Sequence, residues 1–195
     1  MTATCLRADD GTVVPLDLDR WHDRPAPEEL ALLERAGAPV IDLGCGPGRH
    51  LVALGERGVP AMGVDAAPAA VATARSSGAL VLERSVFDRI PGSRRWGTVL
   101  LLDGNIGIGG DPEALLRRAA ALLRPGGTVL VEVGRPGSPS RTLHVTMERG
   151  AVRSPRFPWA VVGADSLPPL ASAAGLAVTE LWQGGERWFS QLTTA

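Results

Sequence analysis

The sequence predicts an α/β fold: a doubly wound, mostly parallel seven-stranded sheet with an antiparallel hairpin at one edge. Short apolar stretches alternate with helical stretches of roughly a dozen residues, which is typical of right-handed strand–helix–strand crossovers. The apolar stretches are continuous rather than alternating, as expected for strands covered on both faces. Residues 176–195 differ, because LAVTELWQGGERWFSQLTTA indicates two strands joined at Gly184 and Gly185.

A predicted helix precedes each of the first three predicted strands. Pro27 suits the opening of the first helix and Gly37 its end, because proline is tolerated in a first helical turn and glycine favours the stop. Pro68 and Gly78 bound the third helix in the same way. In order, these elements are helix 26–37, strand 39–44, helix 49–58, strand 59–65, helix 68–78 and strand 79–85.

The second half continues the alternation and then departs from it. Residues 97–103 form a fourth strand, and residues 111–127 form a helix that Asp111 can cap and Pro125 breaks. A fifth strand follows over 128–134. The remaining elements are a hairpin within 142–154, a helix over 164–175 and the two terminal strands.

Composition excludes several classes of protein. Apolar residues make up 45 % of the chain, which is enough for a core, and the net charge of −1 argues against a general nucleic-acid binder. Cys5 and Cys45 match neither a disulfide framework nor a metal spacing. The sequence shows no signal peptide and no membrane span. We therefore expect a cytoplasmic protein with no membrane or nucleic-acid partner and no metal.

Charge is unevenly distributed along the chain. Residues 1–34 contain Asp9, Asp10, Asp17, Asp19, Asp23, Glu28, Glu29 and Glu34. Residues 135–156 contain Arg135, Arg141, Arg149, Arg153 and Arg156. Two interpretations remain open: solvated surfaces that partly neutralise each other, or a basic wall for an anionic substrate.

The stretch VIDLGCGPGRH, residues 40–50, carries the most specific functional signal. Glycines at 44, 46 and 48 allow the backbone to turn sharply and approach a ligand at the carboxyl end of a strand. Asp65 ends the next strand, where a carboxylate can accept hydrogen bonds from vicinal ribose hydroxyls. The dinucleotide pattern G-x-G-x-x-G would need a third glycine where Arg49 or Leu51 stands, so NAD is the weaker fit.

Three stretches resemble the class I S-adenosylmethionine-dependent methyltransferases. VIDLGCGPG is similar to that family's first motif, GVDAAP to its second, and LLRPGGTVLVEV to its late helix–turn–strand signature. The resemblance covers about residues 39–133 and is consistent with the C-terminal hairpin. It implies a Rossmann-like methyltransferase fold with S-adenosyl-L-methionine as the cofactor.

The resemblance also implies roles for individual residues. Asp42 would lie near the methionine amino group, and Asp65 would bind the ribose. Where many members carry an adenine-binding aspartate, this chain has Ser85, with Asp88 as a rival. Many members begin the fourth strand with an acid, whereas this chain has Gly97. The expected cofactor-binding residues are Asp42, Gly44, Cys45, Gly46, Gly48, Asp65, Ala66, Ser85, Val86, Phe87 and Asp103.

The loop DGNIGIGGD follows the fourth strand and should lie beside the reactive methyl group. Methyl transfer is an in-line displacement, for which most of the acceleration can come from holding the nucleophile about 3 Å away. A base is needed only when the acceptor must lose its proton early. Asp103 and His144 are the candidate catalytic residues. The candidate substrate-binding residues are Trp21, His22, Asn105 and Trp159.

We expect one domain over 1–195, with an N-terminal arm and helix over 1–37, a cofactor-binding core over 38–134, and a substrate-side segment with the terminal hairpin over 135–195. The predicted function is S-adenosylmethionine-dependent methyl transfer to a small molecule. The alternatives are methylation of a protein or nucleic acid, an NAD(P)-dependent oxidoreductase, and a non-catalytic cofactor-binding module.

Overall fold

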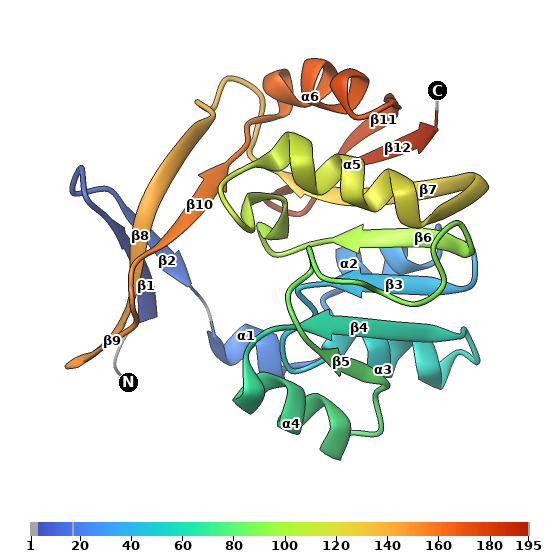
Figure 1. Ribbon diagram of the computed structural model, residues 1–195, viewed down its shortest axis with the longest axis horizontal. Coiled ribbons are helices and arrows are strands. Elements are labelled where there is room, and N and C mark those ends of the chain that lie inside the picture. The colour runs from blue at the N-terminus through green and yellow to red at the C-terminus, as the bar shows by residue number, and fades with distance from the viewer. Residues whose placement is uncertain (1–3, 17, 195) are drawn as a thin grey trace.

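The computed structural model describes residues 4–16 and 18–194, so Asp17 lies outside the described residues. Its main feature is a seven-stranded sheet of order β11-β12-β7-β6-β3-β4-β5 (Figure 1). Strands β7, β6, β3, β4 and β5 run parallel, whereas β12 pairs antiparallel with both β7 and β11. This confirms the predicted fold class. The strands are β3 (Val40–Leu43), β4 (Ala61–Asp65), β5 (Val81–Glu83), β6 (Trp96–Leu101), β7 (Leu123–Val133), β11 (Leu176–Gly184) and β12 (Arg187–Thr194).

Helices cover both faces of this sheet. Alternate strand residues enter two apolar clusters, so that Ile41 packs with the helices of one face and Val40 with those of the other. On the first face lie α5 (Pro112–Leu122) and α6 (Leu167–Ala173). On the second face lie α2 (Pro27–Leu33), α3 (Arg49–Glu56) and α4 (Pro68–Ser76). In the described part of the chain, no helix is long and apolar enough to cross a membrane.

Helix α5 ends earlier than the sequence predicts. Asp111 caps it as expected, since its Oδ1 accepts a hydrogen bond of 2.9 Å from the Ala114 amide. The helix stops at Leu122, because Leu123 is extended and pairs with Trp96 at the start of β7. The predicted end near Gly127 is therefore wrong: pairing with β6 takes the Pro-Gly-Gly segment into the strand.

A second, antiparallel sheet lies beyond the carboxyl ends of the parallel strands, at the left of Figure 1. Its order is β10-β8-β1-β2, with β9 paired to β8. Only its β8–β9 hairpin was predicted. Strands β1 and β2, which pair as an antiparallel hairpin at the N-terminal end, were missed, and so was the pairing of β1 with the distant β8. The strands are β1 (Thr4–Ala8), β2 (Val13–Leu16), β8 (Arg141–Arg149), β9 (Val152–Arg153) and β10 (Phe157–Val161).

This sheet brings the acidic N-terminal segment to the arginines of 135–156. Arg156 pairs with Asp9, and Arg141 Nη1 lies 3.7 Å from Asp10 Oδ2. Arg153 Nε lies 3.2 Å from Glu148 Oε1. The two pairs with Asp9 and Asp10 are exposed on both sides, so each contributes at most about 1 kcal/mol. They support the interpretation that the two segments neutralise each other, rather than the interpretation that the arginines form a basic wall for an anionic substrate.

The glycine that opens the fourth parallel strand has a steric cause. A Cβ at Gly97 would lie 2.4 Å from the carbonyl oxygen of Gly37 and 2.5 Å from that of Ala38. The Gly97 amide donates to the Pro39 carbonyl at 2.8 Å, which holds the two segments together. An acid at this position would force them apart.

We expect Gly97→Ala to lower the unfolding free energy by about 1–3 kcal/mol, because both obstructing atoms belong to the backbone. The matched control is Gly55→Ala in α3, where a Cβ meets nothing within 4 Å. That change should raise stability by about 0.5–1 kcal/mol through helix propensity. Urea unfolding of both variants measures the difference, and equal effects would contradict the steric explanation.

Candidate functional site

The glycine loop and Asp65 meet at the carboxyl edge of the parallel sheet. Asp65 Oδ2 accepts a hydrogen bond of 2.7 Å from the Gly46 amide, and its Oδ1 accepts one of 2.8 Å from the Ala67 amide. Gly44, Gly46 and Gly48 all have positive φ, between 53° and 85°, which favours glycine. The glycine loop and Asp65, both predicted from the sequence, are thus joined directly by the hydrogen bond from Gly46 to Asp65.

Space remains over only part of the loop. A Cβ at Gly46 would meet nothing within 4 Å, so the backbone there is open to a ligand. Over Gly44 lies Asn105, whose Nδ2 donates to the carbonyls of Leu43 and Gly44 at 3.0 and 2.8 Å. Asn105 therefore braces the loop, which differs from its predicted substrate-binding role. A Cβ at Gly48 would lie 2.9 Å from that of Ala74, so Gly48 permits close packing of α3 on α4.

The side chain of Cys45 lies in the core, so only its backbone is available to a ligand. Its thiol is buried in an apolar cluster with Leu51 and Val71. Burial and the nearby carboxylates raise the pKa of the Cys45 thiol. The thiol is therefore inert as a nucleophile at physiological pH.

The predicted adenine end lies on the turn after β5. The Ser85 amide donates to Asp88 Oδ2 at 3.1 Å, and Ser85 Oγ accepts from the Phe87 amide at 3.2 Å. Phe87 is 44 % exposed, whereas Val86 belongs to the core. Ala66, next to Asp65, is also exposed. The ring of Phe87 is thus available to a planar ligand, but contact of Ser85 with adenine stays a prediction.

A buried charge cluster, which the sequence did not reveal, lies beside the glycine loop. At its centre is Glu29 of α2, whose side chain is fully buried. Arg49 Nη1 and Nη2 each lie 2.5 Å from a Glu29 oxygen, and Arg187 also donates to Glu29. Burial by itself would raise the pKa of Glu29, but its contacts with His50, Arg49 and Arg187 outweigh burial and hold that pKa well below its usual range. Glu29 is therefore ionised.

Asp103 lies at the exit of β6, as predicted, and joins this cluster. It is a non-glycine residue with φ of 55°, a conformation that persists where surroundings enforce it. Its amide donates to Glu132 Oε2 at 2.6 Å. Its carboxylate accepts from Arg49 at 2.7 and 2.8 Å and from Arg187 at 2.9 Å. Because guanidinium groups occupy both oxygens, the geometry favours an orienting role for Asp103 over that of a general base.

His50 lies buried between two carboxylates. Its Nδ1 is 3.5 Å from Asp42 Oδ2, and its Nε2 is 3.5 Å from Glu29 Oε1. Burial opposes protonation, but the two carboxylates outweigh it and raise the pKa of His50 to about 9. Among the described residues, Asp42 Oδ2 receives no hydrogen bond although it is buried. Its nearest charged partner is His50, and contact of Asp42 with the methionine amino group stays a prediction.

Glu29, His50 and Asp103 offer ligand atoms within 4.8 Å of one another, which is close enough for a metal ion. The arginines argue against this use. Arg49 and Arg187 bind the same carboxylate oxygens and already supply the positive charge. A divalent cation would have to displace two buried guanidinium groups.

A cavity of about 250 Å³ separates the second sheet from Asp103. Leu6, Leu16 and Trp159 form apolar walls, and Asp103 and Glu132 form the floor. Trp159 is the predicted substrate residue that lines it. The cavity therefore lies against the carboxyl edge of the parallel sheet, on the side of the β6 loop.

Trp21 and His22 do not lie with Trp159. They belong to α1 (Leu18–His22) and line a separate cavity of about 310 Å³ against α3 and α4. Val52 and Thr73 line this second cavity with them, and contact of Trp21 or His22 with a substrate stays a prediction.

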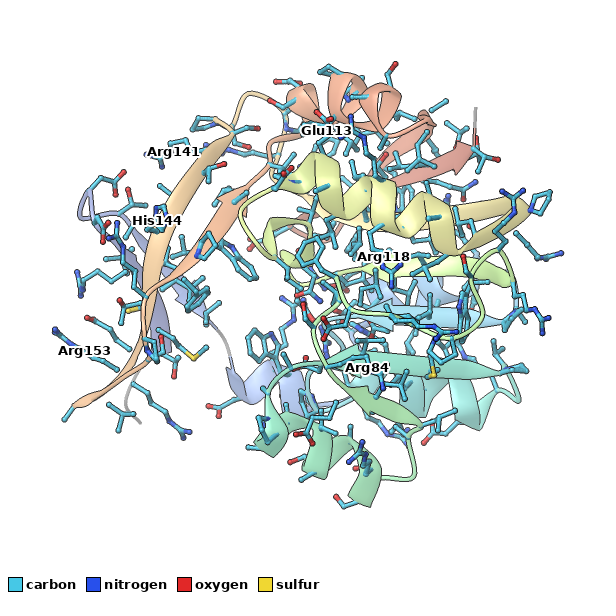
Figure 2. The ribbon with its side chains drawn as sticks, viewed as in Figure 1. Arg84, Glu113, Arg118, Arg141, His144 and Arg153 are labelled. Atoms are coloured by element: carbon cyan, nitrogen blue, oxygen red, sulfur yellow. The ribbon has the colours of Figure 1, made fainter. Side chains whose placement is uncertain are left out.

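His144 also lies away from the site. It is exposed on β8, and its cross-strand partner is Pro158 (Figure 2). The neighbouring Leu143 and Val145 are buried and share the opposite face with Trp159 and Leu6. Since side chains alternate along a strand, His144 points away from the cavity. The structure therefore does not support the predicted catalytic role.

Sequence reasoning missed Glu29, Glu132 and Arg187 as parts of the site. Glu29 was counted among the acids of residues 1–34. It lies in the first turn of α2, where its Oε2 accepts a hydrogen bond of 2.8 Å from the Ala26 amide. Arg187 follows a hairpin turn, where arginine is commonplace. No local pattern distinguishes these residues from solvated charges.

Related proteins are found both by sequence and by structure. A model of a methyltransferase domain family matches residues 18–181. The chain is 30 % identical over 137 residues to a trans-aconitate 2-methyltransferase of Paracidovorax citrulli, covering 68 % of this chain and 52 % of the relative. It is 32 % identical over 135 residues to a ubiquinone biosynthesis O-methyltransferase of Xanthomonas euvesicatoria, covering 58 % and 55 %. The chain thus spans about half the length of these curated relatives.

Solved structures share the fold. A SAM-dependent methyltransferase from Bacteroides fragilis in complex with S-adenosyl-L-homocysteine superposes with a TM-score of 0.82 at 21 % identity, covering 99 % of this chain and 88 % of the other. A sugar N-methyltransferase from Streptoalloteichus gives a TM-score of 0.66 at 20 % identity, with 91 % of each chain covered.

Proposed function

The chain belongs to the S-adenosylmethionine-dependent methyltransferases, since a methyltransferase domain model matches residues 18–181, and from this premise we propose that it methylates a small molecule. The observation that carries the proposal is the cavity of about 250 Å³ beside Asp103. Its volume suits a compound of a few rings at most. Its walls come from two sheets, which leaves little room for a polymer chain.

The residues of the glycine loop fit the cofactor. Gly46 leaves open space, and Asp65 is held by two backbone amides with lone pairs to spare. Among the described residues, Asp42 Oδ2 receives no hydrogen bond, although it lies 3.5 Å from His50 Nδ1. We assign Asp65 to the ribose and Asp42 to the amino group of the methionine moiety. When bound, S-adenosyl-L-methionine supplies a methyl group on a sulfonium.

The chain's own contribution is chiefly positioning. Asn105 fixes the loop from the β6 side, and the arginines fix Asp103 at the floor of the cavity. The apolar walls exclude water from the space in which the acceptor is held. Holding a nucleophile in line at about 3 Å can supply several kcal/mol of the acceleration without a dedicated base.

Nothing in the described structure favours a macromolecular acceptor. The arginines of 135–156 were the feature that suggested one, and three of them pair with acids of the same sheet. The two curated relatives are a trans-aconitate 2-methyltransferase and a ubiquinone biosynthesis O-methyltransferase, and their names do not identify the acceptor here. We also propose a cytoplasmic location, with which the free thiols of Cys5 and Cys45 agree.

S-adenosylhomocysteine at about 100 times its dissociation constant is expected to stabilise the protein by about 2.7 kcal/mol, which raises Tm by about 5–10 °C. NAD and NADP should give no shift. Asp65→Ala should remove most of the shift, because it removes the acceptor of the ribose hydroxyls. The matched control is Asp10→Ala in the turn between β1 and β2, because Asp10 Oδ1, like Asp65 Oδ1, accepts a hydrogen bond from the amide two residues further on. A shift with NAD alone would refute the proposal.

A further inference from the structure

The floor and the walls of the acceptor cavity differ in chemistry. Leu6, Val14 and Leu16 of the N-terminal hairpin and Trp159 of β10 present apolar surface. Asp103 and Glu132 lie opposite, each with a side chain that is 17 % exposed. An occupant therefore meets hydrocarbon on one side and carboxylates on the other.

Among the described residues that line this cavity, the charged side chains are these two carboxylates only. The arginines that neutralise them are Arg49, Arg187 and Arg20, and none of the three lines the cavity. Arg20 Nη2 lies 3.2 Å from Asp103 Oδ1, and its side chain is 35 % exposed. Arg49 and Arg187 are 5 % and 10 % exposed and are held within the buried cluster by Glu29. The lining thus offers hydrogen-bond acceptors and no cationic donor.

Each carboxylate keeps acceptor capacity. Within the described residues, Glu132 Oε1 accepts one hydrogen bond, from Arg187 Nε at 2.7 Å. Asp103 Oδ2 likewise accepts one, from Arg49 Nη2 at 2.7 Å. A carboxylate oxygen has two lone-pair positions, so one position on each remains for an N–H or O–H donor.

From this floor we infer that the acceptor is an uncharged or cationic small molecule whose apolar body rests on Trp159 and whose amine or hydroxyl donates to Asp103 or Glu132. Compounds that carry a carboxylate or phosphate near the reacting group are disfavoured, because such a group offers no N–H or O–H to the floor carboxylates, and the guanidinium groups that pair with those carboxylates do not line the cavity. This inference rests on the proposed function and names the substrate class of the same cavity.

Methyl transfer to such an acceptor needs no reactant beyond S-adenosyl-L-methionine. A cationic acceptor first loses a proton from its ammonium nitrogen to water, which frees the nitrogen lone pair. The lone pair of the neutral amine nitrogen or hydroxyl oxygen then forms the new bond to the methyl carbon, while the bond from carbon to sulfur breaks and its electron pair stays on sulfur. The N–H or O–H proton leaves to water. The carboxylates orient the donor, so its lone pair is directed away from them.

The test uses matched compounds that share a nucleophile and differ in one carboxylate: catechol against 3,4-dihydroxybenzoate, and benzylamine against 4-(aminomethyl)benzoate. Binding to the protein saturated with S-adenosylhomocysteine is measured by calorimetry, and methyl transfer from S-adenosylmethionine by mass spectrometry. We expect at least one compound without the carboxylate to bind about tenfold or more tightly than its partner. Glu132→Gln keeps the shape of the floor and should reduce that ratio, while leaving S-adenosylhomocysteine binding unchanged.

Equal or tighter binding of the carboxylated partners would overturn the inference. So would the failure of every compound to bind while S-adenosylhomocysteine binds. If S-adenosylhomocysteine itself does not bind, the proposed function is refuted. That result is distinguishable from the failure of this inference alone.

Discussion

Glu29→Gln is expected to lower the unfolding free energy by about 3–5 kcal/mol, or Tm by roughly 6–20 °C. The change removes a negative charge that is fully buried against Arg49, Arg187 and His50. These cations then remain buried without their shared partner, and an unpaired buried charge is far more costly than a lost surface pair. Urea unfolding at pH 7 measures the loss.

The matched control is Glu56→Gln. Glu56 lies 3.0 Å from Arg24 in an ion pair whose two side chains are 54 % and 88 % exposed. Its loss should cost less than about 1 kcal/mol. Similar losses in the two variants would mean that the buried cluster contributes no more than a surface pair.

The Glu29 carboxylate should also make the stability of the protein depend on pH in the acid range. The folded-state pKa of Glu29 is depressed below its ordinary value of 4.5. Its stabilisation is therefore present above pH 4.5 and is lost as the pH falls through the folded-state pKa. Glu29→Gln should show a shallower decrease of stability below pH 4.5 than the unchanged protein.

The raised pKa of His50 leads us to expect a loss of stability at alkaline pH. Its pKa rises from 6.5 to about 9 in the folded protein because Asp42 and Glu29 outweigh the burial and the charge of Arg49. The stabilisation is complete below pH 6.5 and is lost as the pH rises through 9. The unfolding free energy should fall by about 3 kcal/mol over this range.

His50→Gln tests this prediction, because glutamine can donate to a carboxylate and does not titrate. The variant should be less stable at pH 6 and nearly constant in stability between pH 6.5 and 9. His22→Gln, at an exposed position on α1, should keep the slope of the unchanged protein. An identical slope in His50→Gln would show that another group causes the alkaline loss.

These two effects concern residues that bracket the proposed cofactor and acceptor sites. Glu29 and Arg187 connect α2 and the C-terminal hairpin to Asp103. His50 connects Glu29 to Asp42 at the end of β3. Because the methyl acceptor must be placed to within a fraction of an ångström, a rigid charged floor serves positioning better than a mobile one.

Much of the parallel core could be predicted from the sequence. Val40–Asp42, the glycines after them and Asp65 lie on neighbouring parallel strands, so their carboxyl ends must meet at one edge. The signals are local: an apolar run, glycines where φ is positive, and an acid at the end of a strand. The hairpin around Gly184 and Gly185 was equally local.

The second sheet and the charge cluster could not be predicted in this way. Strand β1 pairs with β8, and Glu29 pairs with Arg187, across most of the chain. The roles expected of His144, Trp21 and Asn105 differ from their placement for a related reason. A residue type indicates possible chemistry, but contacts with segments distant in the sequence decide what each side chain faces.

The sequence by itself determined the parallel sheet, its glycine loop and the acid that faces it, since each is encoded within a few neighbouring residues. Tertiary structure alone decided which charges are buried together and which apolar faces enclose the acceptor cavity. The physical reason is that burial and charge pairing depend on contacts between distant segments, whereas strand, turn and helix preferences depend on adjacent ones.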